Sequence, residues 1–550
     1  MKLQDLRNSE ETRFDCDVCI VGTGPAGLAI AQELRGAYAR VLMIESGDAR
    51  ASAEHAALDR VESVGAPRLE DQSRVRARVF GGTSTVWNGR CVPLSPLDFA
   101  ERSWVPLSGW PVSHAELQPY FERAGRYLGL WPVRYDSALE ASLPAKLPPL
   151  PDELAGDLMR CTWQYSVDEA NASVPTLSSR AFMDSPPENV EVLLSATATH
   201  IEVDGNAQLQ WLEVRSLNGR VARVHCKLLV VCAGGIETPR LLLHSRSTMS
   251  TGLGNQHDML GRCFMDHPRC TLGHFALADG PRIRPPFMLQ RVDAGGRPRY
   301  FARGLALTPD CQRREQLLNC AAWLDARVAP DDPWHALKRL ARRASAEPLA
   351  DVFSIARQPW LTAQELYRRF VERHPVLFKT DALTLLCDVE QAPNLDSRIG
   401  LSEHLDALGV PMARIDWRFG EAERRTLQRF AGLAQRAFER MGLPQLQLTD
   451  SARTGQFQPG DFVDVAHPAG GTRMASDPRH GVVDEQCQVH GVSGLFVVGT
   501  SVFPTNGHAN PTLTLLALSL RLADHLKQRY LARGAVSGAE PPQPVHVTQL

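Results

Sequence analysis

The stretch that most constrains the fold of this chain is residues 14–47, FDCDVCIVGTGPAGLAIAQELRGAYARVLMIESG. Residues 17–21 are apolar and β-branched and predict a strand, the motif GTGPAG follows at 22–27 without a gap, and apolar residues recur at helical spacing after the motif. Residues 40–44 predict the next strand. Strand, glycine-rich turn, helix and strand in this order are typical of a dinucleotide-binding βαβ unit.

Each glycine of this motif has a steric task. Gly22 makes the turn, Gly24 lets a pyrophosphate approach the backbone, and Gly27 lets the helix pack against the strand. The helix then directs unpaired N–H groups and a partial positive charge at the pyrophosphate. Glu45 stands 18 residues after Gly27, where an acid accepts hydrogen bonds from ribose hydroxyls and repels a 2′-phosphate. These features predict a dinucleotide site without distinguishing NAD from FAD.

Composition sets the outer limits. With 550 residues the chain is too long for a single core, so two domains are expected. A formal charge of −2 provides no electrostatic reason for nucleic-acid binding. The 12 cysteines are scattered, several inside apolar runs, which is typical of buried free thiols in a reducing compartment. No secretion signal and no membrane-spanning apolar run is present, so we expect a cytoplasmic protein.

Glycines also mark two later segments. The loop at 78–90, RVFGGTSTVWNGR, offers backbone, hydroxyl and amide groups for hydrogen bonds to a flat polar ligand, and the alternative is an ordinary surface turn. Residues 227–233 predict an apolar strand that ends at two glycines. A helix is expected after it, with Thr238 as N-cap and Pro239 at its first position. This second strand-turn-helix unit is expected to join the first sheet.

The C-terminal block carries residues suited to catalysis. His467 opens the segment HPAGGTRM, and Asn510 lies at the start of a long helix that is expected to end at about Leu526. A histidine can take a hydroxyl proton near neutral pH, and an asparagine at a helix start can hold the resulting oxygen. Taken alone, each residue is equally explained as a satisfied polar side chain. His267, in the segment DHP, is interpreted as a turn histidine held by its neighbours.

Residues 334–373 are helical in pattern and rich in arginine, with cations beside apolar positions. Such a segment can lie on a membrane surface or on a partner protein. An ordinary solvated helix pair is favoured here, because Pro348 and Pro359 divide the segment into short pieces. The proline-containing tail at 534–550 is expected to be disordered.

Four blocks occur in the same order in the glucose-methanol-choline (GMC) oxidoreductases: GTGPAG, GGTSTVWNGR, CAGGIETPRLLLHS, and HPAGG with GTSVFPTNGHANPTLT. The chain resembles this family over most of its length, most closely the bacterial gluconate dehydrogenase and pyranose oxidase branches. The resemblance implies an α/β fold: a Rossmann-like FAD-binding domain, of the p-hydroxybenzoate hydroxylase type, and a discontinuous α+β substrate domain built on an antiparallel sheet. The FAD-binding domain is expected at 14–100, 189–270 and 455–530, and the substrate domain at 101–188 and 271–454.

The resemblance also implies that the dinucleotide is FAD. Residues implied to bind it are Gly22, Gly24, Gly27 and Glu45 for the adenosine diphosphate half, Ala198 for adenine, Gly81, Gly82, Thr83, Asn88 and Gly89 for the flavin ring, Gly499 and Thr500 near the pyrophosphate, and Pro511 and Thr512 at the pyrimidine end. Flavin-linked relatives carry a histidine where this chain has Val86, so FAD is expected to be non-covalent. Cys311 and Cys320 stand apart, so neither an iron–sulfur cluster nor another metal is expected.

The active pair implied by the resemblance is His467, which removes a hydroxyl proton while the carbon delivers hydride to the flavin, and Asn510, which binds the same oxygen. His508 is a candidate substrate contact or a solvated loop histidine. The expected reaction oxidises a CH–OH group of an alcohol or sugar-like substrate to a carbonyl, with oxygen or another molecule as electron acceptor. Two alternatives stay open: an FAD-containing lyase without net redox, and a flavin subunit that passes electrons to a protein or membrane acceptor through 334–373.

Overall fold

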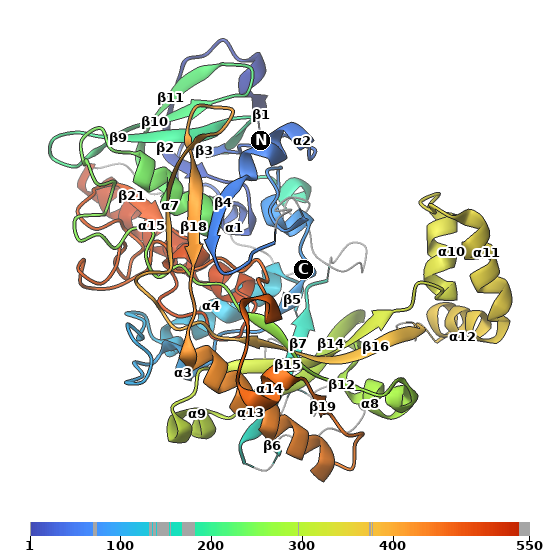
Figure 1. The fold of residues 1–550 in the computed structure, drawn as a ribbon. Coiled ribbons are helices and arrows are strands. Elements are labelled where there is room, and N and C mark those ends of the chain that lie inside the picture. Colours follow the sequence, from blue (N-terminus) through green and yellow to red (C-terminus); the bar gives the residue numbers. More distant parts are fainter. Residues whose placement is uncertain are drawn as a thin grey trace.

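The computed structural model of the chain describes residues 2–69, 74–130, 135, 139, 153–154, 156–167, 182–294, 296–372, 376 and 378–537. Figure 1 shows two lobes and a small helical arm that stands away from them. The strands within these described ranges form three sheets.

The first sheet carries the dinucleotide-binding motif. Its order is β1 (Lys2–Asp5), β8 (Val190–Leu194), β3 (Val41–Ile44), β2 (Arg13–Val21), β11 (Val221–Val231), β10 (Leu209–Arg215) and β9 (Thr197–Val203), with β21 (Leu495–Val497) beside β11. The neighbouring strands β1, β8, β3, β2 and β11 pair in parallel, and β21 pairs in parallel with β11. In contrast, β10 pairs antiparallel with both β11 and β9. The side chains of β3 and β21 are apolar and fully buried, as expected for parallel strands that are covered on both faces. This sheet confirms the Rossmann-like fold.

Helices from distant parts of the sequence cover this sheet. α1 (Pro25–Glu33) packs against α15 (Thr512–Ser537), which packs in turn against α4 (His114–Tyr127). Tyr38 donates a hydrogen bond of 2.7 Å to the Leu526 carbonyl of α15. We expected α15 to end near Leu526 and residues 534–550 to be disordered. The helix instead continues to Ser537, and residues 538–550 lie outside the described part of the chain.

α7 (Gly234–His244) follows β11 directly. We expected this helix to begin with Thr238 as N-cap, but its N-cap is Ala233, five residues earlier, and the helix contains Pro239. The φ angle of +81° at Gly234 lets the chain pass from strand to helix without a linker. The early start brings the first turn of α7 against Pro468, because a Cβ at Gly235 would lie 2.2 Å from the Pro468 carbonyl oxygen.

The second sheet is antiparallel and forms the other lobe. Its order is β19 (Gln447–Leu448), β12 (Arg269–Phe275), β16 (Thr380–Val389), β15 (Cys320–Val328), β14 (Arg297–Leu307), β7 (Leu158–Tyr165) and β5 (Arg90–Cys91), with β13 (Gln290–Ala294), β20 (Phe462–Val463) and β6 (Glu153–Leu154) at its margins. α13 (Glu421–Arg440) lies along it, and its buried apolar stripe shares a core with β15 and β16. Shorter helices belong to this lobe: α3 (Pro96–Phe99), α8 (Gly280–Phe287), α9 (Pro309–Glu315) and α14 (Asp450–Thr454). The short helix α2 (Ala53–Ala56) lies on the first lobe (Figure 1).

A third, three-stranded sheet joins the two lobes. It consists of β17 (Arg398–Leu405), β18 (Pro411–Trp417) and β4 (Val61–Gly65). Because β4 belongs to the range expected for the FAD-binding domain and β17 and β18 to the range expected for the substrate domain, this sheet crosses that boundary. The domain limits themselves stay a prediction.

The arm consists of α10 (Pro333–Ala341), α11 (Pro348–Arg357) and α12 (Pro359–Phe370) (Figure 1). Each helix begins with proline, which has no N–H to satisfy at that position and whose fixed φ suits the first turn. None of the described helices combines the length and the apolar character that crossing a bilayer requires.

Candidate active site

The turn between β2 and α1 has the sterics of a nucleotide cradle. A Cβ at Gly22, where φ is +99°, would lie 2.6 Å from the Cys232 carbonyl oxygen, and a Cβ at Gly27 would lie 2.0 Å from the Gly22 carbonyl oxygen. At Gly24, the N-cap of α1, a Cβ would meet no atom within 4 Å. Side chains are therefore excluded at Gly22 and Gly27, whereas Gly24 leaves room for a phosphate group at the N-terminus of the helix.

Glu45, directly after β3, is buried and faces the same turn. Its Oε2 accepts hydrogen bonds from the Thr23 backbone N–H (3.1 Å) and hydroxyl (2.5 Å), and its Oε1 accepts one from the Gly47 N–H (2.8 Å). Burial raises the pKa of this carboxyl group. Glu45 therefore braces the glycine-rich turn in addition to lining the cavity beside it.

That cavity has a volume of about 450 Å³. The site residues expected from the sequence that line it are Gly22, Gly24, Glu45, Gly82, Thr83, Asn88, Ala198, His467, Gly499, Thr500, Asn510, Pro511 and Thr512, together with Val86. Gly27, Gly81, Gly89 and His508 are not among its described lining residues. A helix N-terminus, a buried acid and a loop of hydroxyl and amide groups along one cavity fit the pyrophosphate, ribose and ring of FAD.

A buried ion-pair network beside this cavity was not expected from the sequence. Arg78 donates to Ser46 Oγ (2.9 Å) and to Asp59 Oδ1 (2.9 Å), and it pairs with Glu237 at 3.0 Å. Glu237 lies in the first turn of α7. The partners come from separate segments and show no common spacing, so only the glycine pair at the start of α7 signals this part of the site.

The two histidines at the other end of the cavity contact each other. Nδ1 of His467 and Nδ1 of His267 are 3.0 Å apart, and the two rings are nearly perpendicular, at 83°. The Nε2 atom of His267 lies 3.3 Å from the Asn506 carbonyl oxygen. His267 is 1% exposed, whereas His467 lines the cavity. The interpretation of His267 as a turn histidine held by its neighbours therefore missed its place in the site.

This geometry selects the tautomers. A carbonyl oxygen can only accept, so neutral His267 carries its proton on Nε2 and presents the lone pair of Nδ1 to His467. His467 then donates from its own Nδ1, and its Nε2 is left with a lone pair. No described residue forms a hydrogen bond to that Nε2 atom, so it can accept a proton from a molecule in the cavity.

The Asp266 carboxylate ties the two histidine segments together. Its Oδ1 accepts the backbone N–H of His267 (2.8 Å) and the backbone N–H of His467 (3.0 Å). Met265 and Ala469 exchange backbone hydrogen bonds of 2.9 and 2.8 Å alongside. The position of His467 is therefore set by main-chain contacts that do not depend on its imidazole.

The surroundings of His467 favour the neutral ring. Burial lowers the pKa of His467 well below its usual value, and the nearby His267, Arg269 and Arg90 lower it further. At neutral pH the imidazole is therefore unprotonated at one nitrogen, which is the state that a general base needs.

His508 lies deeper than expected for a solvated loop residue. Its Nδ1 is 3.0 Å from Asn319 Oδ1, and its Nε2 is 3.5 Å from Cys161 Sγ. Burial, followed by the nearby His267, lowers the pKa of His508 to about 4. Both ring nitrogens have protein partners, and a contact between His508 and the substrate stays a prediction.

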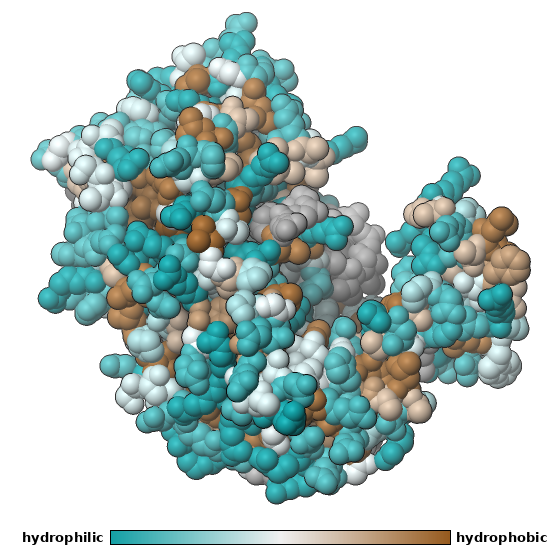
Figure 2. Space-filling view, in the orientation of Figure 1, coloured by the Kyte–Doolittle hydropathy of each residue, from teal (hydrophilic) through white to brown (hydrophobic). Residues whose placement is uncertain are grey.

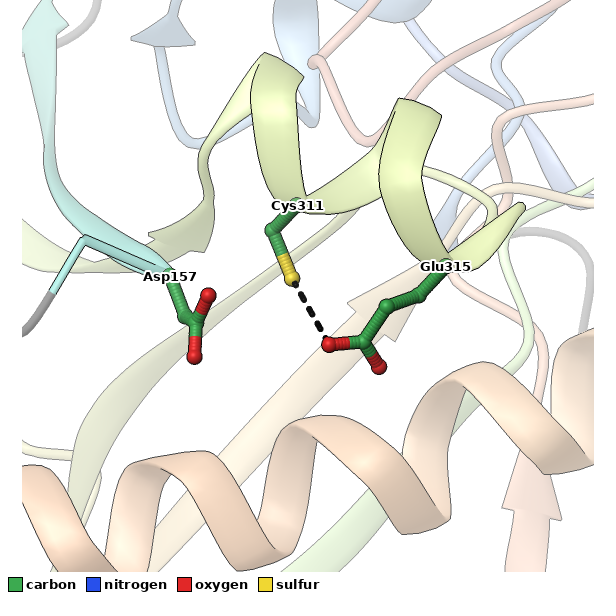
Figure 3. Close-up of side chains that lie close together, drawn as sticks. All are labelled: Asp157, Cys311 and Glu315. Atoms are coloured by element: carbon green, nitrogen blue, oxygen red, sulfur yellow. Dashed lines mark hydrogen bonds between the residues drawn. The ribbon is translucent and has the colours of Figure 1, made fainter.

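Asp157, Cys311 and Glu315 form the one group within the described ranges whose three potential metal-ligand atoms all lie within 4.8 Å of one another (Figure 3). Arg314 pairs with Asp157 at 2.5 Å, and Arg429 pairs with Glu315 at 2.5 Å. Guanidinium groups thus neutralise both carboxylates, and the group is explained as an ion-pair network.

Known proteins resemble the chain over most of its length. It is 24% identical to the 6'''-hydroxyparomomycin C oxidase of Streptomyces lividus over 93% of this chain and 92% of that protein. It is 25% identical to the fructose dehydrogenase large subunit of Gluconobacter japonicus over 61% of this chain and 53% of that protein. Among solved structures, pyridoxine 4-oxidase from Mesorbium loti matches with a TM-score of 0.55 at 18% identity, covering 93% of this chain and 99% of that one.

Family models match the chain in three places. A model described as FAD binding domain matches residues 15–66, which contain the glycine-rich turn and Glu45. Two models described as GMC oxidoreductase match residues 41–269 and 393–519, and the second of these contains His467 and Asn510. The chain therefore belongs to the glucose-methanol-choline oxidoreductase family.

Proposed function

We propose that this protein oxidises a CH–OH group of an alcohol or sugar-like substrate to a carbonyl, with His467 as the base and Asn510 as the holder of the substrate oxygen. The observation that carries the proposal is the contact between His267 and His467, because it leaves a proton acceptor on His467 at the cavity wall. The names of two relatives, 6'''-hydroxyparomomycin C oxidase and fructose dehydrogenase large subunit, support this substrate class.

The chain's residues have separate tasks in this reaction. The turn between β2 and α1 and Glu45 would hold the adenosine diphosphate half of FAD, and the loop that contains Thr83 and Asn88 would hold its ring. FAD, when bound, supplies the acceptor for the hydride that leaves the substrate carbon. His467 takes the hydroxyl proton at Nε2, and the amide of Asn510 donates to the same oxygen. Positioned bases of this kind contribute roughly a hundred- to ten-thousandfold in rate.

Anaerobic mixing of the holoenzyme with a panel of alcohols and sugars tests the proposal. Bleaching of the oxidised flavin together with formation of one carbonyl per flavin is the expected result. A substrate that is cleaved while the flavin stays yellow would instead identify a lyase and overturn the proposal. Admitting oxygen after reduction then separates an oxidase, which is reoxidised at once, from a flavin subunit that delivers its electrons to another acceptor.

A further inference from the structure

Arg90 is a buried cation that forms no ion pair with a residue in the described ranges. It opens β5, is 8% exposed, and lines the cavity that also contains His467. Its guanidinium lies 3.7 Å from the ring centroid of Trp163 and 4.3 Å from that of Trp323. Its Nε and Nη2 atoms are buried and have no hydrogen-bond partner in the part of the chain that the structure describes.

Arg269 is a neighbouring arginine whose guanidinium nitrogens do have an acidic partner. Its guanidinium stacks on the same Trp323, 4.7 Å from the ring centroid. Its Nε and Nη2 atoms hold Asp388 through two parallel hydrogen bonds of 2.7 and 3.0 Å. The same two nitrogens of Arg90 form no hydrogen bond with any described residue. Because a buried charge is costly unless it is paired, a cation kept in this position requires a partner from outside the described chain.

We infer that Arg90 binds a carboxylate of the substrate, so that the substrates are hydroxy acids, which carry a carboxylate near the CH–OH group that His467 deprotonates. This inference rests on the proposed function, since the hydroxyl and the carboxylate belong to one molecule. Arg90 borders the cavity, and the planar fork of a guanidinium matches two carboxylate oxygens, which a neutral hydroxymethyl group cannot replace. The two indole rings hold the plane of the guanidinium and keep water away from it.

The first test compares acids with the matching neutral alcohols. Anaerobic flavin reduction is measured for lactate against 1,2-propanediol and for gluconate against sorbitol, with wild type, Arg90→Met, Arg90→Lys and the exposed control Arg327→Met. We expect wild type to prefer the acids and Arg90→Met to lose roughly ten- to hundredfold on the acids alone, mainly in the substrate concentration needed for half-saturation. Arg90→Lys keeps the charge without the fork and should be intermediate, and Arg327→Met should match wild type.

Binding to the oxidised holoenzyme provides a second test that needs no turnover. Propionate and propionamide are titrated while the flavin absorbance is recorded. Tighter binding of propionate by wild type but not by Arg90→Met supports the inference. Equal binding of both ligands by wild type would overturn the inference. An equal loss of activity on the acid and neutral substrates in Arg90→Met would also overturn it and would indicate that Arg90 acts on the flavin. A wrong assignment of His467 as the base would give a different result. Wild type would then still bind propionate more tightly than propionamide, and His467→Ala would reduce the flavin at the wild-type rate.

The helical arm carries a second, independent inference. Large apolar side chains on α11 and α12 and at the end of α12 are more than half exposed: Leu349, Val352, Phe353, Trp360, Tyr367, Phe370 and Val371. Leu349, Val352 and Phe353 are spaced so that they share one face of α11. Figure 2 shows brown, hydrophobic residues on the outer side of the arm. The expectation of an ordinary solvated helix pair does not fit this exposure.

Positive charge accompanies these apolar groups. Residues 333–372 contain one lysine and six arginines against four acidic residues. Two of the acids are paired within the arm, Asp351 with Arg339 and Glu372 with Arg368. Exposed tryptophan, tyrosine and phenylalanine beside unpaired cations are typical of helices that lie in the headgroup region of an anionic bilayer. We propose that the arm docks on an anionic lipid surface.

Co-sedimentation of the holoenzyme with lipid vesicles tests this proposal. Binding to equimolar phosphatidylglycerol and phosphatidylcholine vesicles but not to pure phosphatidylcholine vesicles is expected, and salt should weaken it. The triple variant Leu349→Ser, Phe353→Ser, Trp360→Ser should lose binding, whereas Leu405→Ser, which removes an exposed leucine of β17, should keep it. Absence of wild-type binding, or binding that the triple variant retains, would overturn the proposal. Dimers in gel filtration that only the triple variant disrupts would assign the face to a second copy of the chain.

Discussion

His267 and His467 are 200 positions apart in the chain, yet their Nδ1 atoms lie 3.0 Å from each other. His267 is anchored on its far side by the Asn506 carbonyl, so its proton position is determined before any substrate binds. Through this contact His267 orients His467, the proposed base, and favours one of its tautomers, although His267 is not among the described residues that line the cavity.

Replacing His267 tests this role. His267→Leu removes the acceptor for Nδ1–H of His467, and flavin reduction should slow roughly tenfold or more. His267 contacts the ring of His467 directly, so its loss should also shift the acidic limb of the reduction rate along the pH axis. His267→Asn, which retains an acceptor oxygen, should recover part of the rate. A merely structural role would leave the pH profile unchanged and would give no such recovery.

His467→Ala should bind FAD like wild type. Its rate of flavin reduction by substrate should fall on the order of a hundredfold or more relative to wild type, as expected for loss of a general base. Stopped-flow absorbance under anaerobic conditions measures the rate, and His257→Ala, at an exposed histidine, is the matched control. Unchanged reduction kinetics in His467→Ala would remove His467 from the mechanism.

His508 should make stability depend on pH. Its pKa in the folded protein, about 4, is lower than its ordinary value of 6.5. The unfolded chain therefore binds more protons between these two values, and stability falls as the pH drops from about 6.5 to about 4. Thermal melts of wild type and His508→Asn across this range measure the effect, and the variant should lose less stability on acidification. Parallel curves for the two proteins would contradict the assignment.

Val86 lines the cavity and is 41% exposed, and a valine side chain cannot form the bond through which a histidine holds flavin. Precipitating the holoenzyme with acid should therefore release the flavin into the supernatant. Yellow colour that stays in the washed pellet would show a covalent link at another residue.

Glu45→Ala should lower FAD affinity roughly five- to two-hundredfold, because the ribose hydroxyls lose a charged acceptor worth about 1 to 3 kcal/mol. The melting temperature of the apo-protein should fall as well, because Thr23 and Gly47 lose their carboxylate partner. Added FAD should raise it by linkage. The FAD-saturated variant should reduce its flavin at nearly the wild-type rate. If the variant kept full FAD occupancy after dialysis but reduced its flavin slowly, the assignment of Glu45 to the adenosine end of the cofactor would be wrong.

Local pattern was sufficient for the nucleotide cradle. Gly22, Gly24, Gly27 and Glu45 act within one βαβ unit, where the spacing of the residues sets their positions directly. The start of α7 was predicted incorrectly, because the sequence pattern indicated Thr238 as its N-cap whereas the helix begins at Gly234. The close packing of Gly235 against Pro468, far away in the chain, could not be predicted from local pattern.

The catalytic end depended on tertiary structure. His467 and Asn510 can be named from their motifs, but the partner of His467 cannot. His267 is brought next to His467 by the Asp266 carboxylate and by the backbone pairing of Met265 with Ala469. Arg90 sits in a motif loop, and its character as an unpaired cation arises from Trp163 and Trp323 on two other strands. The spacing of residues along the chain was enough to predict the glycine-rich cradle and to name His467 as the proposed base. The tautomer proposed for His467 and the role proposed for Arg90 needed the tertiary structure, because both depend on groups brought together from different strands and loops.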